Sequence, residues 1–252
     1  MHALPNAIAF RDPRHGVMGS GWQTRCAAAN SFRCRAGGTI SLTSNAGRTW
    51  RVVLRTPRPV VSVSLVLGTE RAVLDDGENL SSADGGRTWV PAAPVSDPED
   101  GPPCMDSWFV AVAKTSGWTW AICTGEPGVG NVDKSVYRDV FGRWQRVAWT
   151  PMVGQGRGHG GISTYGYPAG IAMAADGFGL IWESRGTLYV TRDGGFRWTA
   201  LPRIAVPELD FGDSVAAIPG GIAFVLLTRS QARRLIVTHD AGRTWVLVHR
   251  WG

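Results

Sequence analysis

The chain contains almost no lysine. Its 252 residues include 26 lysine and arginine side chains, and only Lys114 and Lys134 are lysines. The net charge of +6 is therefore carried by arginines, which are scattered along the chain and form neither a basic run nor a basic helix. Proteins that bind nucleic acid usually gather their positive charge into a patch or stripe. The charge pattern thus does not favour a nucleic-acid partner.

Long hydrophobic runs are absent as well. No stretch approaches the ~18 apolar residues of a membrane span, so we expect no membrane-spanning segment in this sequence. The start of the chain, Met1-His2-Ala3-Leu4-Pro5, lacks the charged and apolar regions of a signal peptide. Apolar stripes with helical periodicity are not found over any convincing length, which argues against a helical solenoid.

The four cysteines do not have the spacing of a zinc site, and no histidine lies near them. We therefore expect neither a metal nor a cofactor. The cysteines fall into two pairs, Cys26 with Cys34 and Cys104 with Cys123. Three connectivities are possible, of which local pairing is the simplest. Two disulfides imply an exported protein, secreted or in the cell envelope, whereas four unrelated buried thiols are the alternative.

Glycine, by contrast, is abundant, and it punctuates a repeated pattern. The stretch Ser82-Ala83-Asp84-Gly85-Gly86-Arg87-Thr88-Trp89 has two close copies, a looser copy and a worn copy. The residues at its Asp, second Gly and Trp positions are Asn45, Gly47 and Trp50; Asp84, Gly86 and Trp89; Asp193, Gly195 and Trp198; and Asp240, Gly242 and Trp245. The worn copy keeps Asp139 and Trp144, but its glycine has slipped by one position.

Such a stretch predicts a turn between two strands. An Asp side chain caps the backbone that follows it, and Gly adopts positive φ without steric cost. The tryptophans that end the five copies are 39, 55, 54 and 47 residues apart, close to the 40–50 residues of a four-stranded propeller blade. We therefore predict an all-β fold, a β-propeller that fills residues 1–252 as a single domain. Its five blades are expected near 5–57, 58–94, 95–150, 151–204 and 205–252.

The pattern Ser/Thr-x-Asp-x-Gly-x-Thr-Trp resembles the Asp-box, or BNR repeat. In the families that carry it, this box is a structural turn between the third and fourth strands of a blade. The stretch from Phe10 to Met18, followed by Gly38-Thr39-Ile40 and a box, looks most like the photosystem II assembly factors. That resemblance implies a non-catalytic scaffold that holds a protein partner. The chain departs from it in having five units and two cysteine pairs.

Sialidases carry the same box, and they would bring an Arg-Ile-Pro motif near the start. The Arg-Ile of this chain, Arg203-Ile204, comes late and is followed by Ala205. Tyr165 and Tyr167 have no Glu at the spacing of that family. We therefore expect a binding module rather than an enzyme, and a glycoside hydrolase is the alternative.

The long connections of the predicted blades all fall on the face opposite the boxes, where binding usually takes place. Three groups of side chains there are candidates. Arg157, His159, Tyr165 and Tyr167 suit a sugar or an anion, unless they belong to an ordinary Gly-rich loop. Glu183, Asp210 and Asp213 offer carboxylates for glycoside hydrolysis, or are plain loop charges. Asp97, Glu99, Asp100 and Asp106 offer oxygen ligands for a cation, but the interleaved prolines and the irregular spacing favour solvated loop charges. The expected ligand is a protein or a glycan.

Overall fold

The computed structural model describes residues 4–23, 36–66, 69–92, 104, 108–115, 118–125, 128, 130–140, 143–151, 158–183, 187–201, 211–229 and 232–252. All regular secondary structure in these ranges is β-strand and turn. Over the same ranges, no helix has the length and apolar character needed to cross a membrane.

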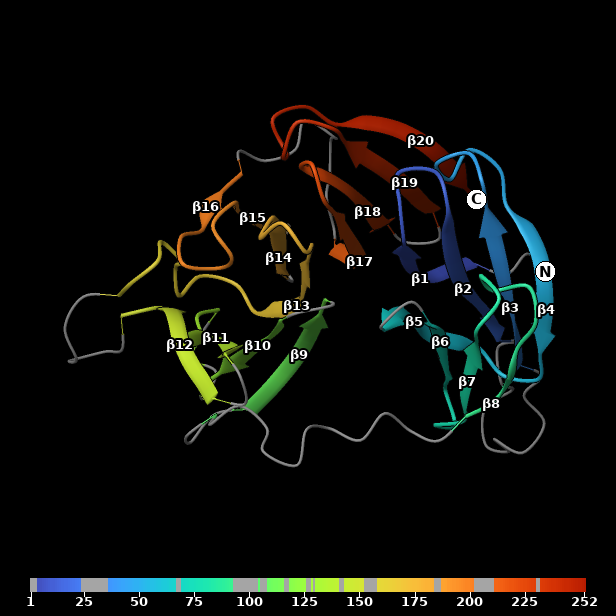
Figure 1. Cartoon of the computed structure of the whole chain (residues 1–252), viewed down its shortest axis with the longest axis horizontal. Coiled ribbons are helices and arrows are strands. Elements are labelled where there is room, and N and C mark those ends of the chain that lie inside the picture. Colours follow the sequence, from blue (N-terminus) through green and yellow to red (C-terminus); the bar gives the residue numbers. More distant parts are fainter. Residues whose placement is uncertain are drawn as a thin grey trace. The chain divides into compact units, whose positions relative to one another are not determined.

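Twenty strands form five sheets (Figure 1). The first two sheets contain β1 (Leu4–Phe10), β2 (Gly16–Gln23), β3 (Ala36–Thr43), β4 (Arg51–Thr56), β5 (Val60–Val66), β6 (Thr69–Leu74), β7 (Asn79–Ser82) and β8 (Val90–Pro91). The third and fourth contain β9 (Trp108–Lys114), β10 (Thr119–Thr124), β11 (Lys134–Val140), β12 (Arg143–Trp149), β13 (Pro168–Met173), β14 (Gly179–Glu183), β15 (Leu188–Thr191) and β16 (Thr199–Ala200). The fifth contains β17 (Phe211–Ile218), β18 (Ile222–Arg229), β19 (Ala232–Thr238) and β20 (Val246–Trp251).

Each sheet is built from four consecutive strands, and neighbours in the chain are neighbours in the sheet. Among the described strands, none pairs with a sheet from the other end of the chain. The predicted fold class, an all-β propeller of five four-stranded blades, is therefore confirmed. The repeated turns lie where they were expected, between the third and fourth strands of their sheets.

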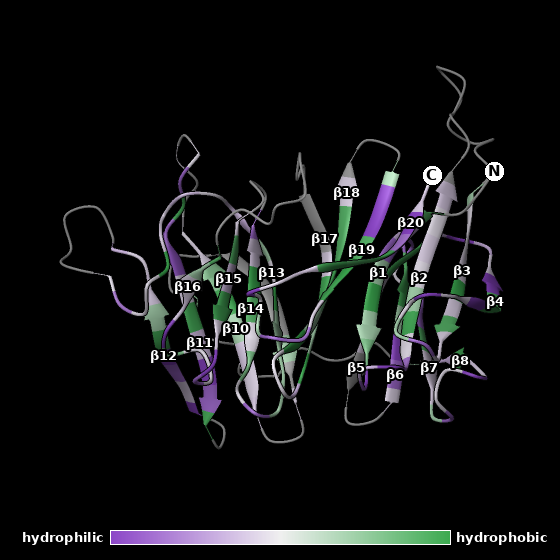
Figure 2. Cartoon of the chain, turned by 90° about the horizontal axis from the view of Figure 1, so that it is seen from above, coloured by the Kyte–Doolittle hydropathy of each residue, from purple (hydrophilic) through white to green (hydrophobic). Residues whose placement is uncertain are grey.

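Burial follows the position of a strand within its blade. In β6 the residues alternate between half-buried and buried, as expected for a strand with neighbours on both faces. The fourth strands are short or exposed: both residues of β8 and of β16 are exposed. Figure 2 shows hydrophobic residues along β1 and β18, two strands whose described side chains are mostly buried.

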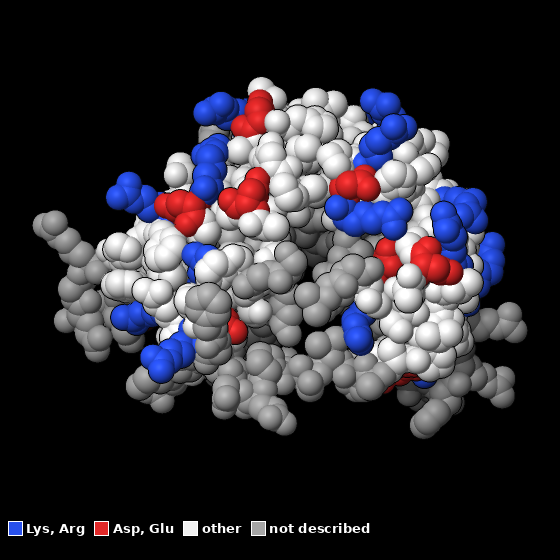
Figure 3. Space-filling model, in the orientation of Figure 1, with Lys and Arg blue, Asp and Glu red and all other residues white. Residues whose placement is uncertain are grey.

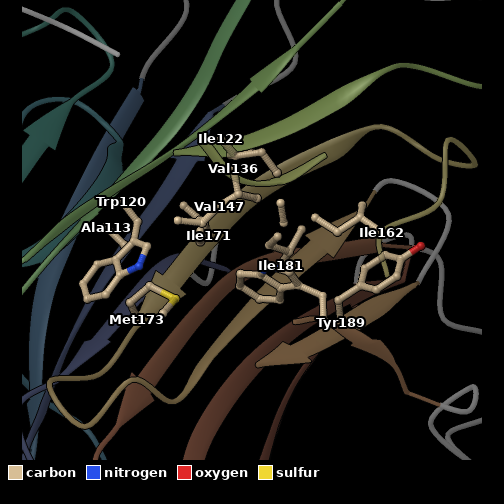
Figure 4. Close-up of a cluster of buried hydrophobic side chains, with 12 residues drawn as sticks. Ala113, Trp120, Ile122, Val136, Val147, Ile162, Ile171, Met173, Ile181 and Tyr189 are labelled. Atoms are coloured by element: carbon tan, nitrogen blue, oxygen red, sulfur yellow. The ribbon is translucent and has the colours of Figure 1, made fainter. Parts of the chain in front are cut away.

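The chain forms two compact units: Met1–Val95 with Gln231–Leu235 and Val248–Gly252, and Ser96–Ser230 with Ile236–Leu247. In the first unit, a core between the first two blades includes Ile40 and Val60, both fully buried. In the second unit, one cluster joins the third and fourth blades (Figure 4). Trp120 and Met173 lie at one end of that cluster, and Ile162 and Tyr189 lie at the other.

Candidate binding site

The repeated turns use their own polar side chains to hold their shape. In the second blade, Oδ1 of Asp84 accepts hydrogen bonds from the backbone N–H groups of Arg87 and Thr88, each at 2.9 Å. Oγ of Ser82 accepts one from the N–H of Gly86 at 2.8 Å, and Gly86 has a φ of 79°. Hydrogen bonds from Thr88 hold the pKa of Asp84 well below its ordinary value. These groups are thus engaged within the turn.

The turns also dock on the preceding blade. A Cβ added to Gly86 would come within 2.7 Å of Leu42 in β3, and one added to Gly195 within 3.4 Å of Trp120 in β10. The indole N–H of Trp120 donates to the carbonyl of Gly194 at 2.8 Å. The glycines of the pattern therefore serve close packing between blades as well as turn geometry.

The segment from Asp139 to Trp144 differs from the other four copies. Asp139 in β11 is the ladder partner of Trp144 in β12, and Val140 is the partner of Arg143, which leaves only residues 141 and 142 between the strands. Oδ1 of Asp139 is buried and has no hydrogen-bond partner among the described residues. The ladder here continues through positions that form the wider turn in the other copies. The expected fifth copy is therefore a tight hairpin.

The predicted loop candidates lie on the connection between β12 and β13. Its described part, residues 158–167, is held by main-chain hydrogen bonds to both neighbouring sheets. The N–H of Trp198 donates to the carbonyl of Gly160 at 2.6 Å, and the N–H of Gly166 donates to the carbonyl of Gly130 at 3.1 Å. This part of the loop is consequently fixed in place by the blades beneath it.

A buried ion pair lies under the same segment. Nζ of Lys134, at the start of β11, is 2.6 Å from Oε1 of Glu183, at the end of β14, and both side chains have no exposed surface. The ammonium also donates to the carbonyls of Ser163 and Tyr165, each at 2.7 Å. Lys134 therefore connects the third blade, the fourth blade and the loop at one point.

Burial dominates the electrostatics of this pair. It raises the pKa of Glu183 and lowers the pKa of Lys134, and the attraction between the two charges opposes both shifts. Apart from the ammonium, the Glu183 carboxylate has no partner among the described residues. Gly166 packs against it with a φ of 80°, and a Cβ there would lie 2.7 Å from Oε2. The loop can approach the carboxylate this closely because residue 166 has no side chain.

The three described loop candidates have different environments. The imidazole of His159 stacks on the indole of Trp149 with ring centroids 4.8 Å apart. The hydroxyl of Tyr167 donates to the carbonyl of Gly128 at 2.6 Å, which fastens a neighbouring loop. Tyr165 is 49% exposed while its carbonyl is held by Lys134. Of the three, Tyr165 best combines a fixed backbone with an accessible ring.

The next candidates are the carboxylates that were considered for hydrolysis or for binding a cation. Glu183 is 1% exposed and paired with Lys134, so the expectation that it faces a ligand is corrected: its place is under the loop. Asp213 lies in β17, but its side chain is outside the described residues, as are Arg157 and Asp210. The acidic group Asp97, Glu99, Asp100 and Asp106 also lies outside them. The described part of the chain therefore offers no accessible carboxylate pair among these candidates.

Lys134 is the residue that the sequence analysis missed. The signal for it in the sequence is the rarity of lysine, because apart from Lys114 every other basic side chain counted as positive is an arginine. A slender ammonium with three donors reaches two carbonyls and a carboxylate at a single point, which a planar guanidinium does not reproduce. The scarcity of lysine thus has a structural counterpart at this position.

One predicted disulfide is present. Cys104 and Cys123 are bonded, with Cα atoms 5.7 Å apart, and the bond ties the segment before β9 to β10. Cys26 and Cys34 lie outside the described residues. Within the described ranges, no three His, Cys, Asp or Glu residues come together as a metal site.

No protein-family model and no curated protein sequence matches the chain. Among solved structures, the chain is similar to YCF48 bound to a D1 peptide, with 13% identity, a TM-score of 0.39, and coverage of 97% of this chain and 82% of that one. It is similar to a GH74 xyloglucanase from Xanthomonas campestris, with 16% identity, a TM-score of 0.37, and coverage of 96% and 38%. A third is PorZ, a surface component of the type-IX secretion system of Porphyromonas gingivalis, with 13% identity, a TM-score of 0.37, and coverage of 97% and 42%. A likeness at this distance assigns no function to the chain.

Proposed function

We propose that the chain is a non-catalytic, exported propeller of the Asp-box type that binds a protein or glycan on the face of its long loops. The observation that carries the proposal is the arrangement of Tyr165. Its ring is 49% exposed, while its carbonyl is held at 2.7 Å by the buried Lys134. A tyrosine on a fixed backbone gives a large contact area with little loss of conformational freedom on binding.

Two further features support this proposal. Glu183, one of the three carboxylates considered for glycoside hydrolysis, is buried and paired with Lys134. A disulfide such as Cys104–Cys123 is typical of proteins that mature outside the reducing cytosol. In the turns that resemble Asp-boxes, the polar side chains form hydrogen bonds within the turn itself, which is consistent with a scaffold role for that face.

The test is a glycan-array screen of the purified chain, beside a fluorogenic-glycoside assay and a pull-down from the source organism. We expect binding without turnover, weakened at least about tenfold by Tyr165→Ala, as expected for a central aromatic contact. Phe196→Arg is the matched control. It alters another exposed aromatic, in a repeated turn, to the residue that three other turns carry at that position. Turnover of a glycoside, or unchanged binding by Tyr165→Ala, would contradict the proposal.

A further inference from the structure

A second feature lies in the first unit, on the side of the repeated turns, and the proposed function does not use it. A cavity of about 400 Å³ opens between the first two blades. Three arginines line it, Arg11 from the end of β1, Arg51 from the start of β4 and Arg87 from the second repeated turn, together with His15, Trp50 and Glu70. Positive side chains with a few acidic ones among them are visible on the surface in Figure 3. The volume is in the range of small-molecule sites, and the lining is more polar than is usual for them, which favours a charged ligand.

Glu70 occupies a place where two other blades have no side chain. In each of these three blades, the hydroxyl residue that opens the repeated turn is paired across the ladder with a residue of the second strand. That partner is Gly16 opposite Thr43 and Gly179 opposite Thr191, but it is Glu70 opposite Ser82. The repeat therefore does not require a carboxylate at this position.

The Glu70 carboxylate is also incompletely satisfied. It is 4% exposed, and its Oε1 is 3.5 Å from a guanidinium nitrogen of Arg11. Its Oε2 is buried without a hydrogen-bond partner among the described residues. A buried carboxylate oxygen without a donor is costly, and a donor from a bound molecule would satisfy it.

Trp50 is a second departure from the repeat at the same cavity. In the other three turns, the tryptophan N–H donates to the carbonyl of the second glycine, at 2.9 Å for Trp89, 2.9 Å for Trp198 and 3.2 Å for Trp245. The N–H of Trp50 is instead buried without a partner among the described residues. Its ring rests edge-on against Phe10, with centroids 6.0 Å apart. Two departures at one cavity point to a site rather than to the scaffold.

The charges around the cavity define the ligand. Arg11 is close to Glu70 and also to Asp12, which accepts a hydrogen bond from the ring of His15 at 2.9 Å. In the described part of the chain, neither Arg51 nor Arg87 is paired with a carboxylate. Two arginines are thus available to an anion, while Glu70 presents an acceptor to a donor. Arginine recognises carboxylates through paired N–H donors.

We propose that this cavity binds a small carboxylic acid that carries a hydroxyl or amino group next to its carboxyl group. Arg51 and Arg87 bind the carboxylate. Glu70 accepts the hydrogen bond of the neighbouring hydroxyl or amino group, and Arg11 positions Glu70. A ligand with the anion but without the donor leaves Oε2 of Glu70 unsatisfied, which is the source of the selectivity.

Four small molecules with the same carbon skeleton test this assignment by ligand-detected NMR titration. Lactate and alanine have both groups, propionate lacks the donor, and lactamide lacks the carboxylate. We expect lactate or alanine to bind at least about tenfold more tightly than both propionate and lactamide. Equal affinities for lactate and propionate, no binding by any acid, or equally tight binding of inorganic phosphate would overturn the proposal.

Variants assign the groups. Glu70→Met keeps the length of the side chain without its oxygens, and it is expected to make the affinities for lactate and propionate equal. Arg51→Gln and Arg87→Gln are each expected to weaken binding of lactate about tenfold. The matched controls are Arg55→Gln, in the same strand as Arg51, and Arg243→Gln, at the position of Arg87 in another repeated turn. Melting curves confirm that each variant is folded. Selectivity that persists in Glu70→Met, or control variants that weaken binding equally, would refute the assignment.

Discussion

The ammonium of Lys134 and the carboxylate of Glu183 meet at 2.6 Å, although 49 residues separate them in the chain and neither side chain is exposed. They belong to different blades, and the ammonium also binds two carbonyls of the loop above. This contact therefore links the scaffold to the loop that carries Tyr165. Its energetics can be tested separately from any ligand.

Replacing one member of the pair is expected to lower the free energy of unfolding far more than replacing both. Lys134→Met leaves the Glu183 carboxylate buried without a counter-charge, and we expect the free energy of unfolding to fall by about 3–5 kcal/mol. Lys134→Met combined with Glu183→Met removes both charges, so the loss should be smaller than in the single variant. Urea unfolding of the wild type, both single variants and the double variant gives the coupling energy.

Amide exchange in the loop gives a second measurement for the same set of variants. The carbonyls of Ser163 and Tyr165 lose their shared donor in the double variant. We therefore expect faster amide hydrogen exchange in residues 158–167 even where global stability recovers. A double variant as unstable as Lys134→Met would show that the two charges do not compensate each other.

The pair also predicts an unusual dependence of stability on pH. Because the pKa of Glu183 is raised, the folded state retains a proton that the unfolded state loses above the ordinary value of 4.5. The stability of the wild type relative to the double variant should therefore fall as the pH rises from 4.5 through the raised pKa. Because the pKa of Lys134 is lowered, relative stability should rise again as the pH increases from that lowered pKa towards 10.5. Chemical denaturation across the pH range measures this difference. A curve that rises from acid to neutral pH would contradict the stated shifts.

Sequence reasoning was most successful where the physics is local. The turns containing Asp84, Asp193 and Asp240 close through hydrogen bonds between residues two to four positions apart. A pattern of eight residues is therefore enough to predict such a turn, and the number and spacing of the turns predicted the five sheets. The worn copy at Asp139 and Trp144 does join the third and fourth strands of its blade, but the pattern of residue types did not reveal that these two residues are ladder partners.

The site depended on contacts that the sequence does not encode locally. The meeting of Lys134 with Glu183, like the placing of Glu70 beside Arg11, is fixed by the packing of one blade on the next. Glu183 was correctly placed near the end of an inner strand, but its burial follows from the loop that folds over it. The bond between Cys104 and Cys123 was one of three possible pairings, and it is the local one.

The asparagine in the first repeated turn leads to another prediction. Oδ1 of Asn45 accepts the N–H of Thr49 at 2.9 Å, as Asp84 and Asp240 accept theirs. Nδ2 of Asn45 also donates to Oγ1 of Thr49 at 2.8 Å. Asn45→Asp should replace this bond by the charge-assisted contact that the hydroxyl of Thr244 makes with Oδ2 of Asp240 at 2.6 Å. The pKa of the equivalent Asp240 is held low by hydrogen bonds from Thr244.

We therefore expect Asn45→Asp to raise the melting temperature at pH 7. The gain should shrink progressively as the pH falls from the ordinary value of 3.8 through the depressed pKa, because a carboxyl with a depressed pKa stabilises only its ionised form. Thermal unfolding at pH 7 and near pH 3 measures both values. An increase of the same size at both pH values would show that charge plays no part.

The disulfide offers the last prediction. Cys104 and Cys123 are 19 positions apart, and closing a loop of that length is expected to stabilise the fold by about 3 kcal/mol. Cys104→Ser with Cys123→Ala should therefore lower the free energy of unfolding by roughly 2–4 kcal/mol in urea. The reduced wild type is the control for packing, because it lacks the bond but keeps the Cys123 side chain, which is 1% exposed and leaves a small void when truncated. If the double variant matches the wild type under oxidising conditions, the bond contributes nothing to stability. A loss in the double variant that persists when both proteins are compared under reducing conditions would instead be a packing effect.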